Sequence, residues 1–504
     1  SLIQIPEAFA KKLPDLESKL NTALASGDIF AQQSAQELLP LVQQAKLLGK
    51  QYDAVIANPP YMGGKGMNTA LKDFAKKKFP DSKSDLFAMF IERGFAWCKD
   101  SGFNSMVTMQ SWMFLSSYEA IREKLLQDRT LSCMVHMGNG VMGIAFGTAA
   151  TIMLNKYISN YAGSFSYCEN DDLSEYGIPK QFPVQNERLK TAKPDDFKKI
   201  PGSPVAYWLS SLMLNTFEKH VKSTTIANSR AGMTSGNNDF FTKQWFEVIS
   251  QDIKIDSEDV NDALNSKKKW FPYNKGGAYR KWYGNISLVI KYDSKNRDLL
   301  KNTGNHCASE DCYFKEAMTW TDLTSGHLGA RFLPKGNIFD IAGHCAYPVI
   351  KNGHLLALGM FNNKFINTIS KVINATMHFQ PGDFRKLPFP KIFNNSDSVI
   401  DLVRKCIALA KLDWDSYETS WDFNQNPIIR MGQPNLEQAF NTWQQQNADA
   451  VAEMKRLEEE NNKLFIDAYG LQDELTPDVP DEQITLTRAD REKDSQRLVS
   501  YALG

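Results

Sequence analysis

The pattern of apolar and polar residues changes along the chain and divides it into four stretches. In residues 1–160, short apolar runs alternate with longer amphipathic ones, which is typical of an α/β fold with a mainly parallel sheet. The predicted strands are Ala54–Ala57, Ser105–Met109, Leu131–His136 and Thr148–Asn155, and the predicted helices are Ile5–Ala25, Asp85–Cys98 and Tyr118–Gln127.

The other three stretches differ from the first and from one another. Residues 161–204 are polar and contain five prolines, which predicts a connector that is only partly ordered. Residues 205–392 mix short aromatic-rich runs with Gly, Asn and Pro turns, which favours an α+β domain. In residues 393–504, apolar positions recur at helical spacing, and 437–469 is predicted to be one long helix or a helical hairpin.

Length and composition set outer limits on the class of protein. At roughly 150 residues per domain, 504 residues predict about three domains. The seven cysteines are sparse and odd in number, which favours a reducing cytoplasm over a disulfide framework. We expect no membrane-spanning helix, because no apolar run reaches about 18 residues. The first residue is Ser1 rather than Met, so we expect the polypeptide to begin upstream.

The strongest chemical signal is the run Asn58-Pro59-Pro60-Tyr61, directly after the predicted strand Ala54–Ala57. Ligands of α/β enzymes bind at the carboxyl ends of the strands. Two prolines fix the backbone φ, remove two N–H donors and hold the preceding asparagine extended. The asparagine amide oxygen and a main-chain carbonyl are thereby left as two acceptors beside a flat aromatic ring.

Two acceptors beside an aromatic ring suit a planar amino group. When both N–H groups are accepted, the nitrogen lone pair is free to attack an electrophilic methyl group, and no strong general base is needed. The target is therefore a planar amine, such as adenine or a side-chain amide. A base within a duplex must be extruded from the stack to reach such a pocket.

Here the sequence resembles amino-methyltransferases that use S-adenosylmethionine. The resemblance gives the catalytic role to residues 58–61, makes Phe146 a second aromatic wall of the base pocket, and places Asp28 and Asp85 at the cofactor. The alternatives are a solvent-facing Asp28 after a helix end, a helix-capping Asp85 and a core Phe146.

The second half resembles the target-recognition regions of gamma-class adenine methyltransferases. The glycine-rich element 230–238 implies DNA contacts from Arg230, Asn237 and Asn238, with a self-bonded turn as the alternative. The stretch 267–283 interleaves cations with aromatic residues, a pattern that suits a nucleic-acid groove but also a solvated face. The residues proposed from it are Lys267, Lys268, Lys269, Arg280, Lys281 and Trp282.

Segments near the C-terminal end extend the resemblance to the BREX (phage growth limitation) adenine methyltransferases. They are Asp413–Phe423, Tyr469–Leu475 and Leu498–Gly504. The family implies antiviral defence related to restriction–modification, with site-specific N6 methylation of adenine in double-stranded DNA, base flipping and other defence proteins as partners. It also implies a Rossmann-like methyltransferase fold, of which this chain would hold the C-terminal part, because no glycine-rich cofactor loop precedes Asp28.

Zero net charge does not argue against DNA, because the charges are unevenly distributed. Residues 65–83 hold six lysines against two acids, and 267–281 hold six cations and no acid. Residues 449–497 carry 14 acids against seven bases. Two other hypotheses stay open: a protein-glutamine methyltransferase, and a non-catalytic DNA-recognition module. We expect no metal site, because the cysteines and histidines lack ligand spacing.

Overall fold

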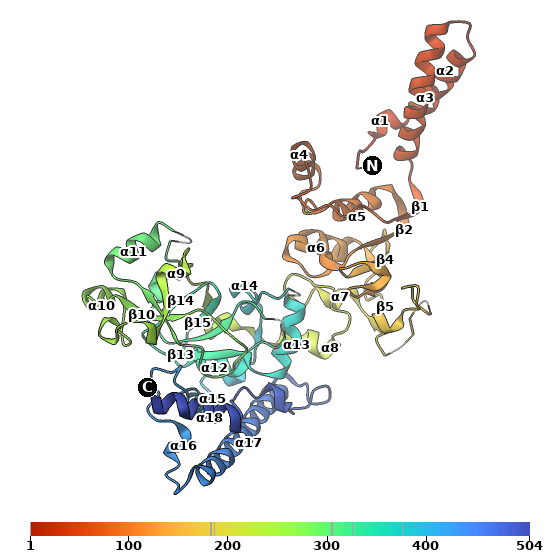
Figure 1. Cartoon of the computed structure of the whole chain (residues 1–504). Coiled ribbons are helices and arrows are strands. Elements are labelled where there is room, and N and C mark those ends of the chain that lie inside the picture. Colours follow the sequence, from red (N-terminus) through yellow and green to blue (C-terminus); the bar gives the residue numbers. More distant parts are fainter. Residues whose placement is uncertain are drawn as a thin grey trace. The chain divides into compact units, whose positions relative to one another are not determined.

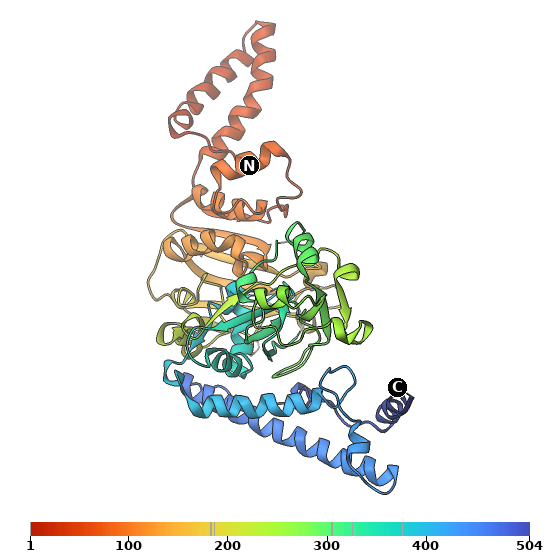
Figure 2. The same cartoon turned by 90° about the vertical axis from the view of Figure 1, so that its left-hand side faces the viewer.

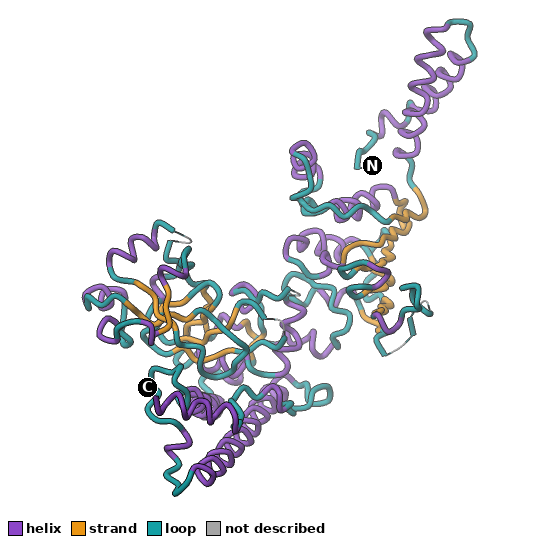
Figure 3. Tube along the Cα trace, in the orientation of Figure 1, coloured by secondary structure: helices purple, strands orange, loops and turns teal. Residues whose placement is uncertain are grey.

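The computed structural model describes residues 2–181, 184–185, 187–303, 306–324, 326–374 and 376–503. It divides into two compact units, Ser1–Leu214 and Asn215–Gly504. Figure 3 shows that each unit has strands of its own, and Figure 1 labels them in chain order.

A six-stranded sheet with the order β1-β2-β4-β3-β5-β6 forms the centre of the first unit. The pairs β1–β2 and β3–β5 are parallel, and the other three neighbouring pairs are antiparallel. The expected mainly parallel sheet is therefore corrected to a mixed one. The reason is local: a short connection joins β3 to β4, and short connections permit only antiparallel pairing. The strands are β1 (Tyr52–Ala57), β2 (Cys98–Met109), β3 (Thr130–Met137), β4 (Thr148–Leu154), β5 (Gly163–Cys168) and β6 (Lys190–Ala192).

Two strands of this sheet come from the stretch expected to be a connector. Both β5 and β6 lie within 161–204, and β5 pairs with β3 along five residues. The prolines that predicted a loose connector lie between and after these strands, where they interrupt no ladder.

The N-terminal helices also differ from the prediction. The single helix expected over Ile5–Ala25 is two helices, because Pro14 is tolerated only in a first helical turn and marks a second start. The long helix α3 was not predicted, since its apolar residues face solvent and only Ala35 and Val42 are buried. Figure 1 shows α2 and α3 as a hairpin. The helices are α1 (Glu7–Ala10), α2 (Leu13–Leu24), α3 (Ile29–Gly49), α4 (Thr69–Lys78), α5 (Leu86–Trp97), α6 (Glu119–Asp128) and α7 (Pro194–Phe197).

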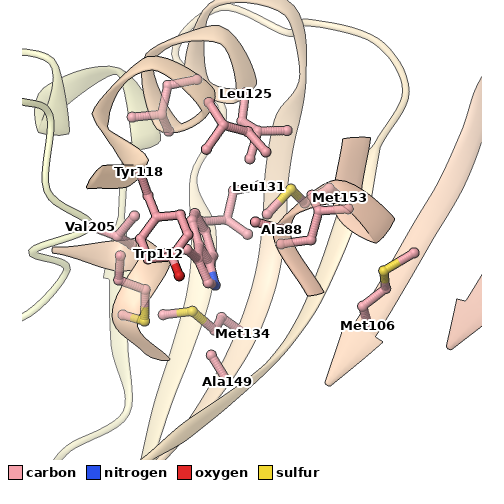
Figure 4. Packing of buried hydrophobic residues seen from close by; sticks show 14 of the residues in the cluster. Ala88, Met106, Trp112, Tyr118, Leu125, Leu131, Met134, Ala149, Met153 and Val205 are labelled. Carbon is pink, nitrogen blue, oxygen red and sulfur yellow. The ribbon is translucent and has the colours of Figure 1, made fainter. Parts of the chain in front are cut away.

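Aromatic and methionine side chains fill the core between the sheet and helices α5 and α6 (Figure 4). Trp112, just beyond the end of β2, is 1% exposed and lies at its centre. Arg122 is buried beside it and donates to the carbonyls of Trp112 (2.8 Å) and Gly202 (2.8 Å from Nε). Burial lowers the pKa of Arg122 to about 10, so the guanidinium stays charged at neutral pH. These contacts fix the backbone where β2 ends.

The second unit has the α+β composition expected for 205–392. It contains four-stranded sheets of order β14-β10-β11-β9 and β13-β12-β15-β8, and the pair β16–β7. Its strands are β7 (Val221–Lys222), β8 (Ala227–Arg230), β9 (Thr242–Gln244), β10 (Trp270–Asn274), β11 (Leu288–Lys291), β12 (Ala317–Thr321), β13 (Ala330–Leu333), β14 (Ile338–Phe339), β15 (Gly343–Pro348) and β16 (Pro388–Phe389). The helices among them are α9 (Asn238–Phe241), α10 (Val260–Asn265), α11 (Ser294–Lys301), α12 (Gly353–Phe361), α13 (Lys364–Ile373) and α14 (Pro381–Phe384), and α8 (Ser211–Lys219) spans the boundary between the units.

The C-terminal stretch is helical, as predicted. The 34-residue helix α17 (Leu436–Tyr469) is continuous, which decides against a hairpin over 437–469. It runs alongside α15 (Asp397–Trp414), as Figure 2 shows. The shorter α16 (Pro427–Arg430) and α18 (Arg491–Leu503) complete this region. Among the helices of the described residues, none has the length and apolarity to cross a membrane.

Buried ion pairs join the helical region to the sheets of the second unit. The Lys281 ammonium is ion-paired with Glu458 on α17, and Trp282 Nε1 donates to the same carboxylate at 2.8 Å. Arg280 pairs with Asp413 on α15 at 2.6 Å. Burial raises the pKa of Glu458, and the neighbouring Lys281 opposes that rise. In the pair Lys281–Glu458, each buried charge is compensated by the other, so the loss of one residue leaves the other charge uncompensated.

Replacing one partner of this pair should therefore destabilise the protein strongly. Glu458→Gln keeps an acceptor for Trp282 but leaves the Lys281 ammonium buried without a counter-charge, so we expect a loss of about 3 kcal/mol in the free energy of unfolding. Adding Lys281→Met should restore most of that loss. Urea denaturation measures both, with the exposed Glu460→Gln as a control that changes nothing measurable. Equal stability of the single and double variants would contradict the pairing.

Candidate active site at the edge of the first sheet

Three strands of the first sheet bring their connections to one edge. Strands β1 and β2 are parallel and end there, and β4 begins there because it runs antiparallel to β2. Asn58 follows β1, Gln110 follows β2, and Phe146 stands two residues before β4. Carboxyl ends of strands gather ligands in α/β folds, so this edge is the natural place for a site.

The segment after β1 lies across β2. The Tyr61 hydroxyl is 3.3 Å from Asn58 Oδ1 and 3.2 Å from the carbonyl oxygen of Val107, so it shares its proton between two acceptors. Burial raises the pKa of Tyr61, which keeps the hydroxyl protonated. Pro59 is buried, whereas Asn58 and Pro60 are exposed. The asparagine amide is therefore held at the surface by the turn beneath it.

The strand before this segment is exposed, although its apolar composition predicts a buried one. Strand β1 is the edge strand of the six-stranded sheet, and Ile56 is 81% exposed. Only one long edge of β1 is paired among the described residues.

The predicted aromatic walls come together beside Asn58. The ring centroids of Tyr61 and Phe146 are 5.7 Å apart at an interplanar angle of 68°. Phe87, on α5, meets the Tyr61 ring from another direction at 6.1 Å and 90°. Phe146 is 38% exposed, so it is not a core residue. We call Asn58, Tyr61 and Phe146 the aromatic corner.

Asp85 stabilises the far end of this segment. Its Oδ1 accepts hydrogen bonds from the backbone N–H of Met62 (2.9 Å) and of Phe87 (3.2 Å), and it is the N-cap of α5. The side chain is buried at 6% exposure. This is the capping role weighed against cofactor contact in the sequence, and it also holds the aromatic corner against α5.

Asp28 lies elsewhere in the first unit. It is exposed and caps α3, accepting hydrogen bonds from Phe30 N (2.9 Å) and Ala31 N (3.2 Å). The 21 residues of α3 stand between it and β1, a length of about 30 Å at 1.5 Å per residue. The structure does not bring Asp28 to the aromatic corner.

A buried histidine at the same edge was not predicted from the sequence. His136 Nε2 is 2.6 Å from Gln110 Oε1, and His136 Nδ1 is 3.0 Å from the Tyr207 hydroxyl. Burial lowers the pKa of His136 to about 4, so the ring is neutral near pH 7. Their positions in the sequence are the signal that could have identified these two residues, since His136 ends a predicted strand and Gln110 directly follows another.

Three residues from the basic and aromatic stretch are not on a surface. Lys281 is 4% exposed and Trp282 is 0% exposed, both bonded to Glu458, and Arg280 is paired with Asp413. Their carboxylate partners lie more than 100 residues away in sequence, which local pattern does not reveal. Their burial corrects the expectation that they offer side chains to DNA.

The other residues expected at DNA are more accessible. Arg230, Lys267 and Lys269 are exposed, whereas Lys268 is half-buried and donates to the carbonyl of Gln251. Two asparagine oxygens are engaged locally: Asn237 Oδ1 accepts from Phe240 N at 3.1 Å, and Asn238 Oδ1 accepts from Ser235 Oγ.

Near this element, one of three neighbouring lysines lies over an exposed aromatic ring. Lys291 Nζ lies 3.8 Å from the ring centroid of Phe240, which is 45% exposed, and 5.4 Å from that of Trp270. Lys269 Nζ lies 5.9 Å from Trp270. Burial lowers the pKa of Lys291, and the charges of Lys269 and Lys243 lower it further. We call Lys243, Lys269 and Lys291 the lysine cluster; no carboxylate of the described residues forms a salt bridge with them.

Comparison with known proteins links this site to a family. Residues 7–142 match the family described as Eco57I restriction-modification methylase. The chain is 39% identical over 486 residues to the adenine-specific methyltransferase BrxX of Escherichia coli O9:H4 (strain HS), covering 94% of this chain and 39% of the relative. This chain is a relative of the adenine-specific methyltransferases. The resemblance expected from the sequence is confirmed.

A second relative gives the same result. The adenine-specific methyltransferase PglX of Lacticaseibacillus casei (strain Zhang) is 35% identical over 490 residues, covering 93% of this chain and 40% of the relative. The chain thus spans about two fifths of the length of both relatives. Among solved structures, the Type IIL restriction-modification enzyme MmeI in complex with DNA aligns at a TM-score of 0.46 and 12% identity, over 88% of this chain and 57% of that one.

The double role of Asp85 predicts that the helix cap and the site are coupled. Asp85→Ala removes the acceptor of two backbone N–H groups, so we expect a loss of about 1–2 kcal/mol in unfolding free energy. Amide exchange of Met62 should accelerate together with that of Phe87. Asp85→Asn should retain most of the stability and the slow exchange, since asparagine caps equally well.

The matched control is Asp28→Ala, which removes a cap of the same kind from α3. Amide exchange should then rise at Phe30 and Ala31 and stay unchanged at Met62. Unchanged exchange of Met62 in Asp85→Ala would contradict the proposed link between this cap and the aromatic corner.

Proposed function

We propose that this chain supplies the target-base side of an S-adenosylmethionine-dependent methyltransferase that methylates N6 of adenine at a specific DNA site, within a phage-defence system. The observation that carries the proposal is the aromatic corner, in which Asn58 stands beside two converging aromatic rings at a sheet edge. The similarity to BrxX and PglX over nearly the whole chain supports it.

The chemistry of the target side follows from the residues present. An adenine extruded from the duplex would lie against Tyr61 and Phe146, and its amino group would donate one N–H to Asn58 Oδ1. That bond replaces the one from the Tyr61 hydroxyl, which keeps the Val107 carbonyl as an acceptor. With that proton accepted, the nitrogen lone pair would be free to form the new N–C bond while the bond from the methyl group to the cofactor sulfur breaks and leaves its electron pair on sulfur. The surplus proton on nitrogen would leave to solvent afterwards.

The cofactor side depends on other residues. S-adenosylmethionine would supply the methyl group when bound. The two acids expected to hold it, Asp28 and Asp85, both accept hydrogen bonds as helix N-caps. This supports the proposal that the target base is served by this chain and that residues other than these two acids hold the cofactor.

The DNA surface of the second unit is proposed to include the lysine cluster and Arg230. The three lysines form no salt bridge with a carboxylate of the described residues, and one of them, Lys291, lies over the exposed ring of Phe240. They would offer charge to phosphates and a ring to a base or sugar. Lys267 and Lys268 extend the same basic stretch along the chain. Other defence proteins are proposed as further partners on the strength of the family resemblance.

The function is tested by removing the acceptor. In the complete product of the gene, Asn58→Ala should lower adenine methylation by roughly a hundredfold or more, as expected for the loss of one preorganised hydrogen bond at the reacting group. DNA affinity should stay unchanged, because the contact forms only with an extruded base. Labelled cofactor with duplex DNA, or with a protein extract, measures the transfer and its target.

The control variant is Asn21→Ala on the exposed face of α2, which should leave methylation unchanged. Transfer of label to protein instead of DNA would favour a glutamine methyltransferase. DNA binding without any transfer by the unsubstituted protein would favour a recognition module.

The lysine cluster predicts a salt effect. Replacing Lys243, Lys269 and Lys291 by glutamine should weaken DNA binding by a similar factor for all sequences. The slope of log affinity against log salt should fall by about 0.9 for each phosphate that the protein no longer neutralises. A titration at several salt concentrations measures this, with Lys335, Lys391 and Lys405 replaced together as the control. An unchanged slope would place the DNA elsewhere.

A further inference from the structure

Gln110 presents a free donor at the same sheet edge as the aromatic corner. Its backbone N–H donates to the carbonyl of Gly147 at 3.0 Å, which ties the end of β2 to the start of β4. Its side-chain oxygen faces His136 Nε2 at 2.6 Å. Its side-chain nitrogen has no hydrogen-bond partner among the residues that the structure describes, and the residue is half-buried.

The Gln110 amide and the Tyr207 hydroxyl occupy the two nitrogens of His136. A neutral imidazole carries one N–H, and the Gln110 carbonyl oxygen can only accept, so Nε2 is the donor. Nδ1 is then an acceptor for the Tyr207 hydroxyl. The histidine ring itself is held by neighbouring rings, with centroids 4.8 Å away in Tyr167 and 6.2 Å away in Phe114. The Gln110 carbonyl oxygen faces this buried ring, and its NH2 group is left for a ligand.

Gly147 places that NH2 group next to the aromatic corner. A Cβ atom at Gly147 would overlap the Gln110 amide, so the side chain lies directly over this glycine. The residue before it is Phe146, whose ring meets Tyr61. We therefore expect that a base stacked on Tyr61, with its amino group at Asn58, brings the edge of its ring within reach of Gln110.

We propose that Gln110 is a specificity-determining residue that donates a hydrogen bond to a ring nitrogen of the extruded adenine, with His136 and Tyr207 as positioning residues. The proposal rests on the proposed adenine methyltransferase function. Adenine carries acceptor nitrogens N1, N3 and N7 and no ring donor, so an amide N–H matches any of them. A glutamine side chain of a protein substrate has the same amino group but no ring nitrogen, and Gln110 would discriminate against it.

The test combines base analogues with a change at Gln110. Duplexes carry 1-deaza-, 3-deaza- or 7-deazaadenine at the target position, and the complete product of the gene methylates them in single-turnover reactions. With the unsubstituted protein, the analogue that lacks the bonded nitrogen should react roughly tenfold more slowly than adenine, as expected for one hydrogen bond. With Gln110→Met, that difference should disappear. Intrinsic reactivity of each analogue cancels when its rate relative to adenine is compared between the two proteins.

Gln110→Glu is the second variant, because a carboxylate still accepts from His136 but has no N–H to donate. It should lose the same discrimination, while Tyr207→Phe should lose part of it. Gln127→Met, on the exposed face of α6, is the control and should keep it. Melting temperatures close to that of the unsubstituted protein show that the variants fold.

The possible results distinguish the role proposed for Gln110 from the proposed methyltransferase function. If both Gln110 variants discriminate among the three analogues as the unsubstituted protein does, the role of Gln110 is overturned and the methyltransferase function stands. If the unsubstituted protein methylates no adenine in DNA, the proposed function fails first, and the role of Gln110 fails with it.

Discussion

The direction of β4 is the constraint on which the candidate site depends. Because β4 runs antiparallel between β2 and β3, its first residues meet the last residues of its two neighbours. A segment that precedes β4 in the chain, with Phe146 and Gly147, thereby joins the segments that follow β1 and β2. With β4 parallel, Phe146 would stand at the opposite edge, and Tyr61 would lose its contact with that ring. The order and direction of the strands therefore create the site, because they bring these side chains together.

The parts of the site that the sequence predicted are those that short-range geometry determines. Two prolines restrict the backbone at Asn58 whatever surrounds it, so the exposed amide followed from four residues. Phe146 needed the family resemblance, since nothing local distinguishes it from a core residue. Gln110, His136 and Tyr207 were missed because their hydrogen bonds span 26 and 71 residues. The exposure of the edge strand β1 was not predicted either, because the order of strands in a sheet depends on residues that are distant in the sequence.

The basic and aromatic stretch shows how charge pattern misleads when its partners are distant. Lys281 and Glu458 are 177 residues apart, and each alone resembles a solvated charge. Burying an unpaired ion costs several kcal/mol, so such a residue is buried only where tertiary structure brings the counter-ion. Lys291 lies on β11, outside the predicted stretch, yet it lies near the exposed ring of Phe240. The number of cations in residues 267–281 thus predicted a basic surface, but that stretch contains only one residue of the lysine cluster, Lys269.

The two polar groups proposed to meet the base have opposite hydrogen-bonding character, and this difference carries the selectivity. Asn58 offers an oxygen, which any planar amino group satisfies, so it provides reactivity with little choice of substrate. Gln110 offers N–H, because the neutral His136 already occupies its oxygen. A ligand must then present a donor and an acceptor at once, and leaving either protein group unpaired costs about 1–3 kcal/mol. In the proposed arrangement the buried histidine bonds the oxygen of the glutamine amide and leaves its N–H groups for recognition.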